Sequence, residues 1–379
     1  MRSKKKILLF IDWYLPGHRA GGPIRSCANL IGHLKDEFDF SVVTRDTDYQ
    51  TNNPYPGIHS NAWNILPDGT RVYYFSKDQL SRKNIRALIR NEQYDAVYLN
   101  GIFSWHFTIV PLQLLRNMSK VKVIVASRGM LADSALAIKK YKKKMFLFFA
   151  NLMDLYADVL FHVSNIQEAD SVKKVFGRNA RTHIAPNLAE KNSSSLWFSR
   201  VRSGPLKLVC LARIAPEKNI RFALEVLKEV KAEVVYDVYG PVYDEEYMQA
   251  CRQVVAELPP NVSVNFKGGI ESEKVHQTLT QYDFLFLPTL GENFGHAILQ
   301  SMQAGAPVII SDRTMWSNLE AQNAGWDIAL TEKKHFISVT EKCAGITQDY
   351  YDVLSRGAYD YALAYANSKE SIEMNRQLF

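Results

Sequence analysis

The sequence predicts two α/β domains in tandem, each built on a doubly wound parallel sheet. At 379 residues the chain is too long for one compact core, which favours two domains. Short apolar runs of strand length alternate with helical segments, the pattern of parallel sheets covered by helices. The alternation stops near residue 190 and restarts near residue 205. Ligands of such sheets bind at the carboxyl ends of the strands, so we expect a binding cleft between the two domains.

The predicted first domain spans residues 1–190 and the second spans residues 205–355, with a polar, Ser-rich linker at 191–204. The predicted strands of the first domain are residues 6–12, 40–44, 72–75, 96–100, 121–127 and 159–164. Those of the second are residues 206–212, 234–240, 262–268, 283–288 and 307–311. Two of the helices between them are expected at 24–34 and 296–304.

Composition and charge restrict the kind of partner. The formal net charge of +7, with 47% apolar and 22% charged residues, favours a globular protein with an anionic partner and does not single out nucleic acid. The cysteines are scattered without metal-binding spacing, which indicates a reducing compartment and no metal site: Cys27, Cys210, Cys251 and Cys343. The first apolar run is too short for a signal peptide, and no run is long enough to span a membrane. We therefore expect a cytoplasmic protein, free or attached to a membrane surface.

Residues 283–311 carry the most informative pattern in the chain. A strand is followed by a turn-rich loop, a helix and a second strand, with Gly305 where a helix C-cap is expected. A glycine-containing loop that enters a helix N-terminus is suited to bind phosphate, because unpaired amides and the positive end of the helix both favour an anion. The carboxylate of Glu292 suits the hydroxyls of a sugar beyond that phosphate.

Two further patterns suit phosphate groups. Arg213 and Lys218 follow the first strand of the second domain, where two cations could hold a pyrophosphate and stabilise its charge as it leaves. Gly21 and Gly22 lie between the first strand and the first helix, where glycine lets the backbone approach a phosphate. The alternatives are a solvated basic loop for the first pair and a plain turn for the second.

Three other features leave alternatives open. Asp46 and Asp48 follow a strand and could hold a divalent ion, but a capped loop is the favoured interpretation. His106, alone near a strand end, is more often structural. A basic run beside the aromatic-rich segment 145–156 could contact an anionic bilayer, although a solvated face followed by a core-facing one is favoured. That run consists of Lys139, Lys140, Lys142, Lys143 and Lys144.

The motifs together resemble those of retaining glycosyltransferases of family 4, and most closely those of bacterial enzymes that assemble surface polysaccharides. The resemblance runs nearly end to end, and the segment around Glu292 is its most specific part. It rests on DWYLPGHRAGGPIRS, YLNGIFSWHF, SRGML, FHVSNIQEAD, APNL, LARIAPEKN, VYGPVYDEEY, PTLGENFGHAILQSMQAGAPVIISDRTMWSNL and AGWDIAL. It implies the GT-B fold, with two facing Rossmann-like domains and residues 356–379 crossing back onto the first.

The resemblance also implies roles for the residues singled out above. Gly21 and Gly22 would approach the donor phosphates from the first domain. Arg213 and Lys218 would hold the pyrophosphate and stabilise the nucleotide diphosphate as it leaves. Glu292 would bind the donor-sugar hydroxyls.

Three neighbouring residues and two departures from the family pattern complete the implied site. Amides of Asn293, Phe294 and Gly295 would surround the sugar and phosphate. The glutamate that binds the ribose in the family falls at Gln300, whose amide can still hydrogen-bond hydroxyls without the strength of a carboxylate. Where many members have a histidine, this chain has an RGM-type motif, and its Arg128 could contact the phosphate or the acceptor.

The implied reaction is transfer of a sugar, with retention, from a UDP- or GDP-sugar to a hydroxyl of a glycan or lipid-linked glycan. No cofactor is expected and no metal, because cations and helix dipoles would neutralise the leaving diphosphate. Two alternatives stay open. One is a nucleotide-sugar epimerase of the same fold, and the other is a homologue that binds a nucleotide sugar with weak or no turnover.

Overall fold

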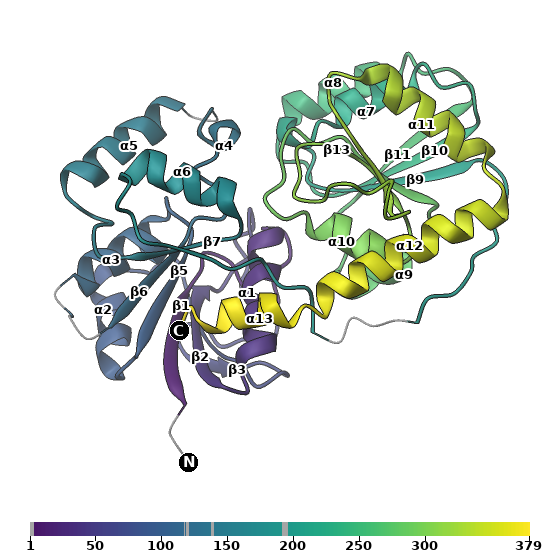
Figure 1. Cartoon of the computed structure of the whole chain (residues 1–379). Helices are drawn as coiled ribbons and strands as arrows, with labels where there is room; N and C mark the ends of the chain where they lie inside the picture. The colour runs from purple at the N-terminus through teal and green to yellow at the C-terminus, as the bar shows by residue number, and fades with distance from the viewer. Residues whose placement is uncertain (1–3, 117, 119–120, 138–139, 192–195) are drawn as a thin grey trace. The chain divides into compact units, whose positions relative to one another are not determined.

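The chain folds into two compact units. The computed structural model describes residues 4–116, 118, 121–137, 140–191 and 196–379. The first unit comprises Met1–Lys191 with Ser368–Phe379, and the second comprises Asn192–Asn367. Each is described by itself below, with the labels of Figure 1.

The first unit is built on an eight-stranded sheet in the order β3-β4-β2-β1-β5-β6-β7-β8. All neighbouring strands are parallel except β3 and β4, which are antiparallel. The strands are β1 (Lys5–Phe10), β2 (Phe38–Arg45), β3 (Trp63–Ile65), β4 (Arg71–Phe75), β5 (Ala96–Asn100), β6 (Lys122–Ala126), β7 (Leu160–Val163) and β8 (Thr182–Ile184).

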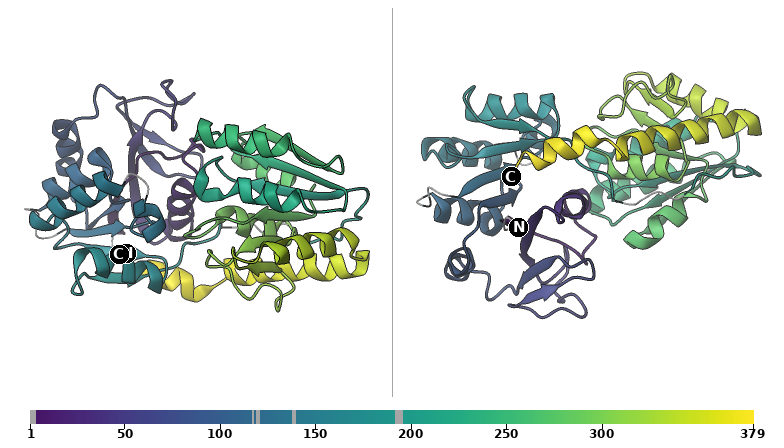
Figure 2. Two further views of the ribbon diagram at one scale, coloured as in Figure 1. Left: turned by 90° about the horizontal axis from the view of Figure 1, so that it is seen from above. Right: turned by 60° about the horizontal axis from the view of Figure 1, so that its bottom comes forward.

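Helices cover both faces of this sheet, as Figure 1 and Figure 2 show. In β1, Ile7 and Leu9 pack into one apolar core, whereas Leu8 and Phe10 pack into a second on the opposite face. This alternation follows from the two-residue period of a strand, and it explains why the run reads as continuously apolar. The helices are α1 (Gly22–Leu34), α2 (Arg82–Asn91), the π-helix η1 (Trp105–Ile109), α3 (Val110–Leu115), α4 (Asp133–Ala137), α5 (Lys140–Leu152), α6 (Ile166–Phe176) and α13 (Lys369–Arg376).

The second unit has a six-stranded parallel sheet in the order β11-β10-β9-β12-β13-β14. Its strands are β9 (Leu206–Leu211), β10 (Val234–Tyr239), β11 (Val262–Gly268), β12 (Phe284–Leu287), β13 (Val308–Ser311) and β14 (Gly325–Ile328). Its helical segments are η2 (Pro216–Lys218), α7 (Ile220–Leu227), α8 (Glu245–Val255), η3 (Ser272–Lys274), α9 (Val275–Leu279), α10 (His296–Gln303), α11 (Lys333–Gly345) and α12 (Gln348–Ala366). Because β9 and β12 are neighbours and parallel, their carboxyl ends lie at the same edge of the sheet.

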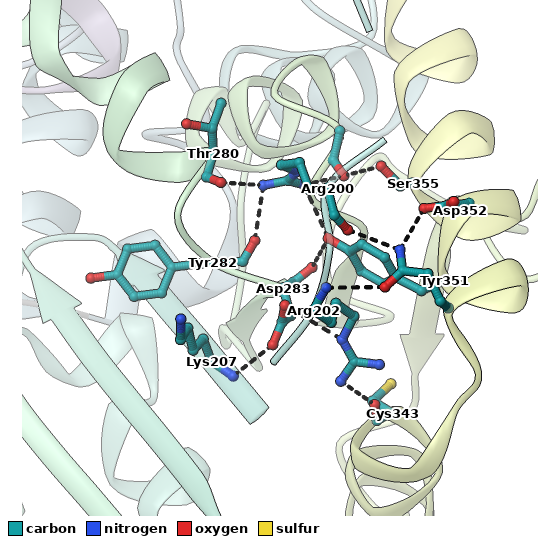
Figure 3. A network of polar contacts seen from close by, with 12 residues as sticks. Arg200, Arg202, Lys207, Thr280, Tyr282, Asp283, Cys343, Tyr351, Asp352 and Ser355 are labelled. Carbon is teal, nitrogen blue, oxygen red and sulfur yellow. Dashed lines mark hydrogen bonds and ion pairs between the residues drawn. The ribbon is translucent and has the colours of Figure 1, made fainter. Parts of the chain in front are cut away.

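Residues 196–204 of the predicted linker pack on the second unit. Arg200 donates to the carbonyl oxygen of Thr280 at 2.6 Å, as Figure 3 shows, and to that of Gly305 at 2.6 Å. Arg202 donates to the carbonyl of Cys343 at 2.9 Å and lies 3.4 Å from the Asp283 carboxylate. The two arginines bind carbonyls after α9, after α10 and within α11, which makes this stretch part of the second unit.

Replacing Arg200 by alanine is therefore expected to destabilise the second unit by about 2–3 kcal/mol, because carbonyl groups are left without their donor. The measurement is a urea titration followed by labelling of the buried Cys251, which lies in this unit. Arg252→Ala is the control, since Arg252 lies exposed on α8. Equal labelling midpoints for both variants would contradict the anchoring role.

The predicted segment 356–379 is divided between the units. Helix α12 continues to Ala366 in the second unit, and only Ser368–Phe379 joins the first. Ser368 caps α13 by accepting from the Ser371 amide at 3.2 Å, which starts a new helix. Arg376 then forms two hydrogen bonds with the Glu37 carboxylate, at 2.6 and 2.8 Å.

The strands that were not predicted are short or weakly apolar. Strand β3 has the sequence WNI and pairs antiparallel with β4, and β14 has the sequence GWDI. Neither run is long enough to show a period. Among the described residues, no helix has both the length and the apolar character needed to cross a membrane.

Candidate functional site

The loops that follow β9 and β12 are joined at the carboxyl edge of the second sheet. The carbonyl oxygen of Glu217 accepts from the Leu290 amide and from the Thr289 hydroxyl, both at 2.9 Å. Asn219, in a left-handed conformation with φ 56°, donates its side-chain amide to the Pro288 carbonyl at 2.9 Å. These bonds hold the LARIAPEKN and PTLGENFG motifs against each other.

Lys218 and Glu292 form an ion pair across these two loops. Lys218 lies at the end of η2 and is buried, and the Glu292 side chain is largely covered as well. The amide of Glu292 donates to the Arg313 carbonyl at 3.0 Å, which ties it to the loop after β13. A buried ammonium and a carboxylate thus lie together where a phosphate and sugar hydroxyls are expected.

The N-terminus of α10 opens at the same loop. Gly295 has φ 77° and provides no side chain to cap the helix. This positive φ favours glycine, and a Cβ atom there would also lie 2.8 Å from Ile298 Cδ1. Trp316 donates its indole N–H to the Phe294 carbonyl at 2.5 Å, and the Phe294 ring is buried. The indole therefore fixes the backbone that leads into α10.

Arg213 and its neighbours add a second cation beside this loop. Its guanidinium carbon lies 4.6 Å from the centre of the Tyr243 ring, and one terminal nitrogen lies 3.3 Å from Glu217 Oε1. The Arg213 side chain is 37% exposed, so an anion can reach it. The second unit thus carries both predicted cations, each paired with a carboxylate.

The remaining predicted donor-side residues lie on the same segment. Asn293 is half-buried between Glu292 and Phe294, and Gln300 lies half-buried on α10, whose buried residues include Ile298 and Leu299. Gly305 follows α10 with φ 67°, as its predicted C-cap role requires.

In the first unit, Gly21 precedes α1 with φ 72° and nothing within 4 Å of an added Cβ. Gly22 is the first residue of α1, and that helix has no side-chain cap. The loop before them is held by Asp48, whose Oδ2 accepts from the amides of His18 (3.0 Å) and Arg19 (3.2 Å). Asp46 accepts from the Ser60 hydroxyl at 2.7 Å. The two aspartates therefore serve as loop anchors, the interpretation favoured from the sequence.

Arg128 lies in a left-handed turn with φ 50°, and its side chain is turned toward the protein. Its Nε donates to Asn100 Oδ1 at 2.7 Å and one terminal nitrogen donates to the Tyr98 hydroxyl at 2.8 Å. A further hydrogen bond joins it to Asn187. The turn is secured by the buried Glu168 carboxylate, which accepts from the Ser127 hydroxyl at 2.7 Å.

A polar cluster that the sequence did not reveal lies at the carboxyl ends of β1, β2 and β5. Ser104 donates to Asp12 Oδ1 at 2.9 Å, and Arg45 lies 3.5 Å from the same oxygen. Burial raises the pKa of the Asp12 carboxyl, although Ser104 and Arg45 oppose the shift. Burial and Arg45 lower the pKa of His106. Ser104 and His106 belong to the π-helix η1 and its cap, and such helices are frequent at functional sites.

The structure divides the basic run, most of which forms the start of α5. Lys140, Lys142 and Lys144 are exposed, whereas Lys143 donates to the Ala135 carbonyl at 2.6 Å. Lys139 lies outside the described residues. No group of three or more His, Cys, Asp or Glu side chains suited to a metal ion occurs in the part of the chain that the structure describes.

Two parallel-sheet α/β units in one chain, as found here, confirm the predicted GT-B fold class. Residues 195–335 match the family model described as glycosyl transferases group 1. This matched region lies in the second unit and contains Arg213, Lys218 and Glu292. The similarity to glycosyl transferases group 1 thus lies in the part of the chain that carries the ion pair.

Among curated proteins, the chain is similar to the GtfA subunit of the UDP-N-acetylglucosamine–peptide N-acetylglucosaminyltransferase of Streptococcus pneumoniae. The two are 24% identical over 118 residues, and the match covers 30% of this chain and 22% of that protein. The matched region therefore spans only about a fifth of the length of this curated relative.

Solved structures match over nearly the whole length. Sucrose-phosphate synthase from Thermosynechococcus elongatus has a TM-score of 0.74 at 14% identity, and covers 99% of this chain and 98% of its own. HepE of Anabaena in complex with UDP and glucose has a TM-score of 0.71 at 14% identity, with the same coverage. WaaG, a glycosyltransferase involved in lipopolysaccharide biosynthesis, has a TM-score of 0.67 at 13% identity, with 98% of each chain covered.

Proposed function

We propose that the protein transfers a sugar, with retention of configuration, from a nucleotide-sugar donor to a hydroxyl of a glycan or lipid-linked glycan. The observation that carries the proposal is the covered ion pair of Lys218 and Glu292 beside the N-terminus of α10. An ammonium and helix amides suit a diphosphate, and a carboxylate suits sugar hydroxyls. Lys218, Glu292 and the start of α10 therefore suit both the diphosphate and the sugar of a nucleotide-sugar donor. These residues also agree with the pattern of retaining family 4, to which we assign the chain.

The proposed donor is a UDP- or GDP-sugar. HepE binds UDP-glucose in its solved complex, and GtfA is named for UDP-N-acetylglucosamine, so uridine is the first base to test. Arg213 and Lys218 would stabilise the negative charge that develops on the leaving diphosphate. We propose that they do so without a metal ion, and unchanged turnover in EDTA would support this role.

In the proposed reaction the bond between the anomeric carbon and the diphosphate breaks first, on the face where the acceptor oxygen then bonds. The departing phosphate oxygen takes the proton of the acceptor hydroxyl. No side chain need act as a nucleophile. Glu292 would hold the sugar hydroxyls, and the amides of residues 293–295 would surround the sugar and phosphate.

On the acceptor side, we propose the polar cluster of Asp12, Arg45 and Ser104 as a group that binds acceptor hydroxyls, while Gly21 and Gly22 keep their proposed role at the donor phosphates. Carboxylate, guanidinium and hydroxyl groups at three strand ends are the chemistry that polyhydroxylated ligands require. We place the acceptor among the precursors of a bacterial surface polysaccharide. The similarity to WaaG supports this assignment.

Thermal stabilisation by UDP, GDP, ADP and their sugars tests the donor proposal. A ligand at a hundredfold excess over its Kd adds about 2.7 kcal/mol, which gives a clear shift. We expect one nucleotide to stabilise the wild type and Arg213→Ala to abolish the shift. Arg252→Ala, an exposed arginine of α8, serves as the control. If no nucleotide shifts the wild type, the donor proposal is wrong.

A binding protein with weak turnover is the second candidate, and Gln300 is the observation that favours it. Replacing Gln300 by glutamate is expected to tighten nucleotide binding by about fivefold, because a carboxylate binds ribose hydroxyls more strongly than an amide does. Isothermal titration of both proteins with the stabilising nucleotide measures this. An unchanged or weaker affinity would show that Gln300 does not face the ribose.

Release of free sugar from the donor without an acceptor would separate a transferase from a binding protein. Interconversion of free nucleotide sugars would instead identify an epimerase.

A further inference from the structure

Helix α5 presents apolar side chains on two opposite faces. One face packs inward, where Leu147 and Ala150 are buried and the Phe146 ring lies 5.5 Å from that of Phe103. The core-facing interpretation of segment 145–156 holds for these residues and, after the helix, for Leu155 and Tyr156. The rest of the apolar side chains of α5 do not join the core.

The opposite face forms an outward apolar stripe, which consists of Tyr141, Met145, Phe148, Phe149 and Leu152. At about 100° per residue these five positions fall within an arc of about 100° on the helix surface. Their exposed fractions range from 49% for Phe149 to 87% for Tyr141. Met153, directly after the helix, is 54% exposed and extends the stripe. Adjacent exposed side chains of this size on one helix face indicate a contact surface.

Lysines flank the stripe on both sides. The same helical geometry places Lys142 on one side and Lys140 and Lys144 on the other, and all three are exposed. Residues 140–153 contain no aspartate or glutamate. Along α5 the stripe therefore has an apolar centre with lysines on both sides, and the one exposed carboxylate next to it, among the described residues of this segment, is Asp154, after Met153. The surface that fits this helix is apolar within and anionic at its rim.

We propose that α5 docks the first unit on an anionic lipid bilayer, lying in the plane of the interface with the stripe below the headgroups. Aromatic and long aliphatic side chains would enter the acyl boundary, while the lysine side chains extend to the anionic headgroups. A second copy of this chain fits less well, because two such helices packed face to face would bring their lysines together. This inference goes beyond the proposed function and does not rest on it, although a lipid-linked acceptor would be found at that surface.

The test is sedimentation of the full chain with vesicles of phosphatidylcholine alone, or of phosphatidylcholine and phosphatidylglycerol in equal amounts. We expect binding to the anionic vesicles that weakens as salt rises, and little binding to the neutral ones. Phe148→Ser/Leu152→Ser is expected to weaken binding to the anionic vesicles more than about tenfold, because two apolar side chains are no longer available for transfer from water into the bilayer. Lys142→Gln/Lys144→Gln is expected to weaken it roughly tenfold.

Ile65→Ser/Val353→Ser is the matched control, since both residues are exposed and apolar but lie on β3 and α12. It should bind vesicles as the wild type does. All four substituted α5 positions are exposed, so thermal melting should be unchanged and loss of fold is separable from loss of binding.

Three results would overturn the proposal. The wild type could stay in solution with both kinds of vesicle. Phe148→Ser/Leu152→Ser could bind as the wild type does, which would leave the stripe without a role. Light scattering could show a wild-type dimer that this variant lacks, which would assign the stripe to a second copy. Because no sugar donor is present, none of these results bears on nucleotide binding.

Discussion

Replacing Lys218 by methionine is expected to lower kcat/KM for sugar transfer by about 10²–10³-fold, the usual cost of one preorganised charge at a leaving group. Lys218 is buried at the end of η2 and forms an ion pair with Glu292. A buried ammonium needs no reorganisation when charge develops on a diphosphate, so its contribution to the transition state is large. Methionine retains much of the aliphatic stem, and the change removes mainly the charge.

Lys228→Met is the matched control, because Lys228 also forms an ion pair in the second unit, 2.6 Å from Glu257, but in solvent. A surface pair of this kind contributes little, so activity should be unchanged. The double variant Lys218→Met/Glu292→Gln reports the coupling between the two residues. If Lys218→Met kept wild-type turnover while losing thermal stability, the pair would be structural and the proposed role of Lys218 would be wrong.

The donor-side motifs could be predicted because each is local in sequence. The apolar run that forms β12 has the length of a strand, and α10 begins at His296, directly after Gly295. Parallel strands place their carboxyl ends at one edge, so the loops that carry Lys218 and Glu292 were expected on the same side. The ion pair between these two side chains could be found only in the structure, because the residues lie 74 positions apart in the sequence.

The cluster of Asp12, Arg45 and Ser104 could not be predicted for the same reason. Each residue follows a different strand, and no spacing in the sequence connects positions so far apart. Asp12 and Ser104 both fall within motifs quoted above, but nothing in those motifs joins them to each other or to Arg45, and the residues WHFTI do not indicate the π-helix η1. Tertiary contacts, which periodicity does not report, bring the three side chains together.

Helix α5 shows a limit of periodicity itself. Its apolar residues occupy both faces, so no single helical stripe stands out, and the sequence could not say which face is buried. Lys143 shows this too, because its side chain donates to the Ala135 carbonyl, whereas Lys142 and Lys144 on either side of it are exposed. Only the packing of α5 against the apolar core of the first unit separates its core-facing residues from the exposed ones.

The second large effect concerns the buried His162 on β7. Its Nε2 donates to the Ala185 carbonyl at 2.8 Å, so the neutral ring accepts at Nδ1 from the Tyr98 hydroxyl at 2.7 Å. That hydroxyl in turn accepts from Arg128 at 2.8 Å. Burial, with Arg128 and His183 adding to it, lowers the pKa of His162 from 6.5 to about 3. A proton on Nδ1 would point at the hydrogen of the Tyr98 hydroxyl, which donates to Nδ1 in the neutral ring.

Since the folded pKa lies below the unfolded one, His162 contributes stability that is complete above pH 6.5 and is lost as the pH falls toward 3. Between these two pKa values, His162 is protonated in the unfolded chain and neutral in the folded chain. At pH 4.5, two units below the unfolded pKa, the loss is about 2.7 kcal/mol. In His162→Gln this part of the pH dependence should be absent, although the variant is less stable at pH 7.

The measurement is a urea titration at pH 7 and pH 4.5, followed by modification of the buried Cys27 with dithiodipyridine. Cys27 is the cysteine of the first unit, so its modification reports the opening of that unit alone. Other groups titrate in both proteins, and the difference between wild type and variant isolates His162. Equal losses in both proteins on acidification would mean that His162 is protonated within the folded unit. His162 would then be a second buried cation close to Arg128, whose guanidinium already donates to the Tyr98 hydroxyl and to Asn100.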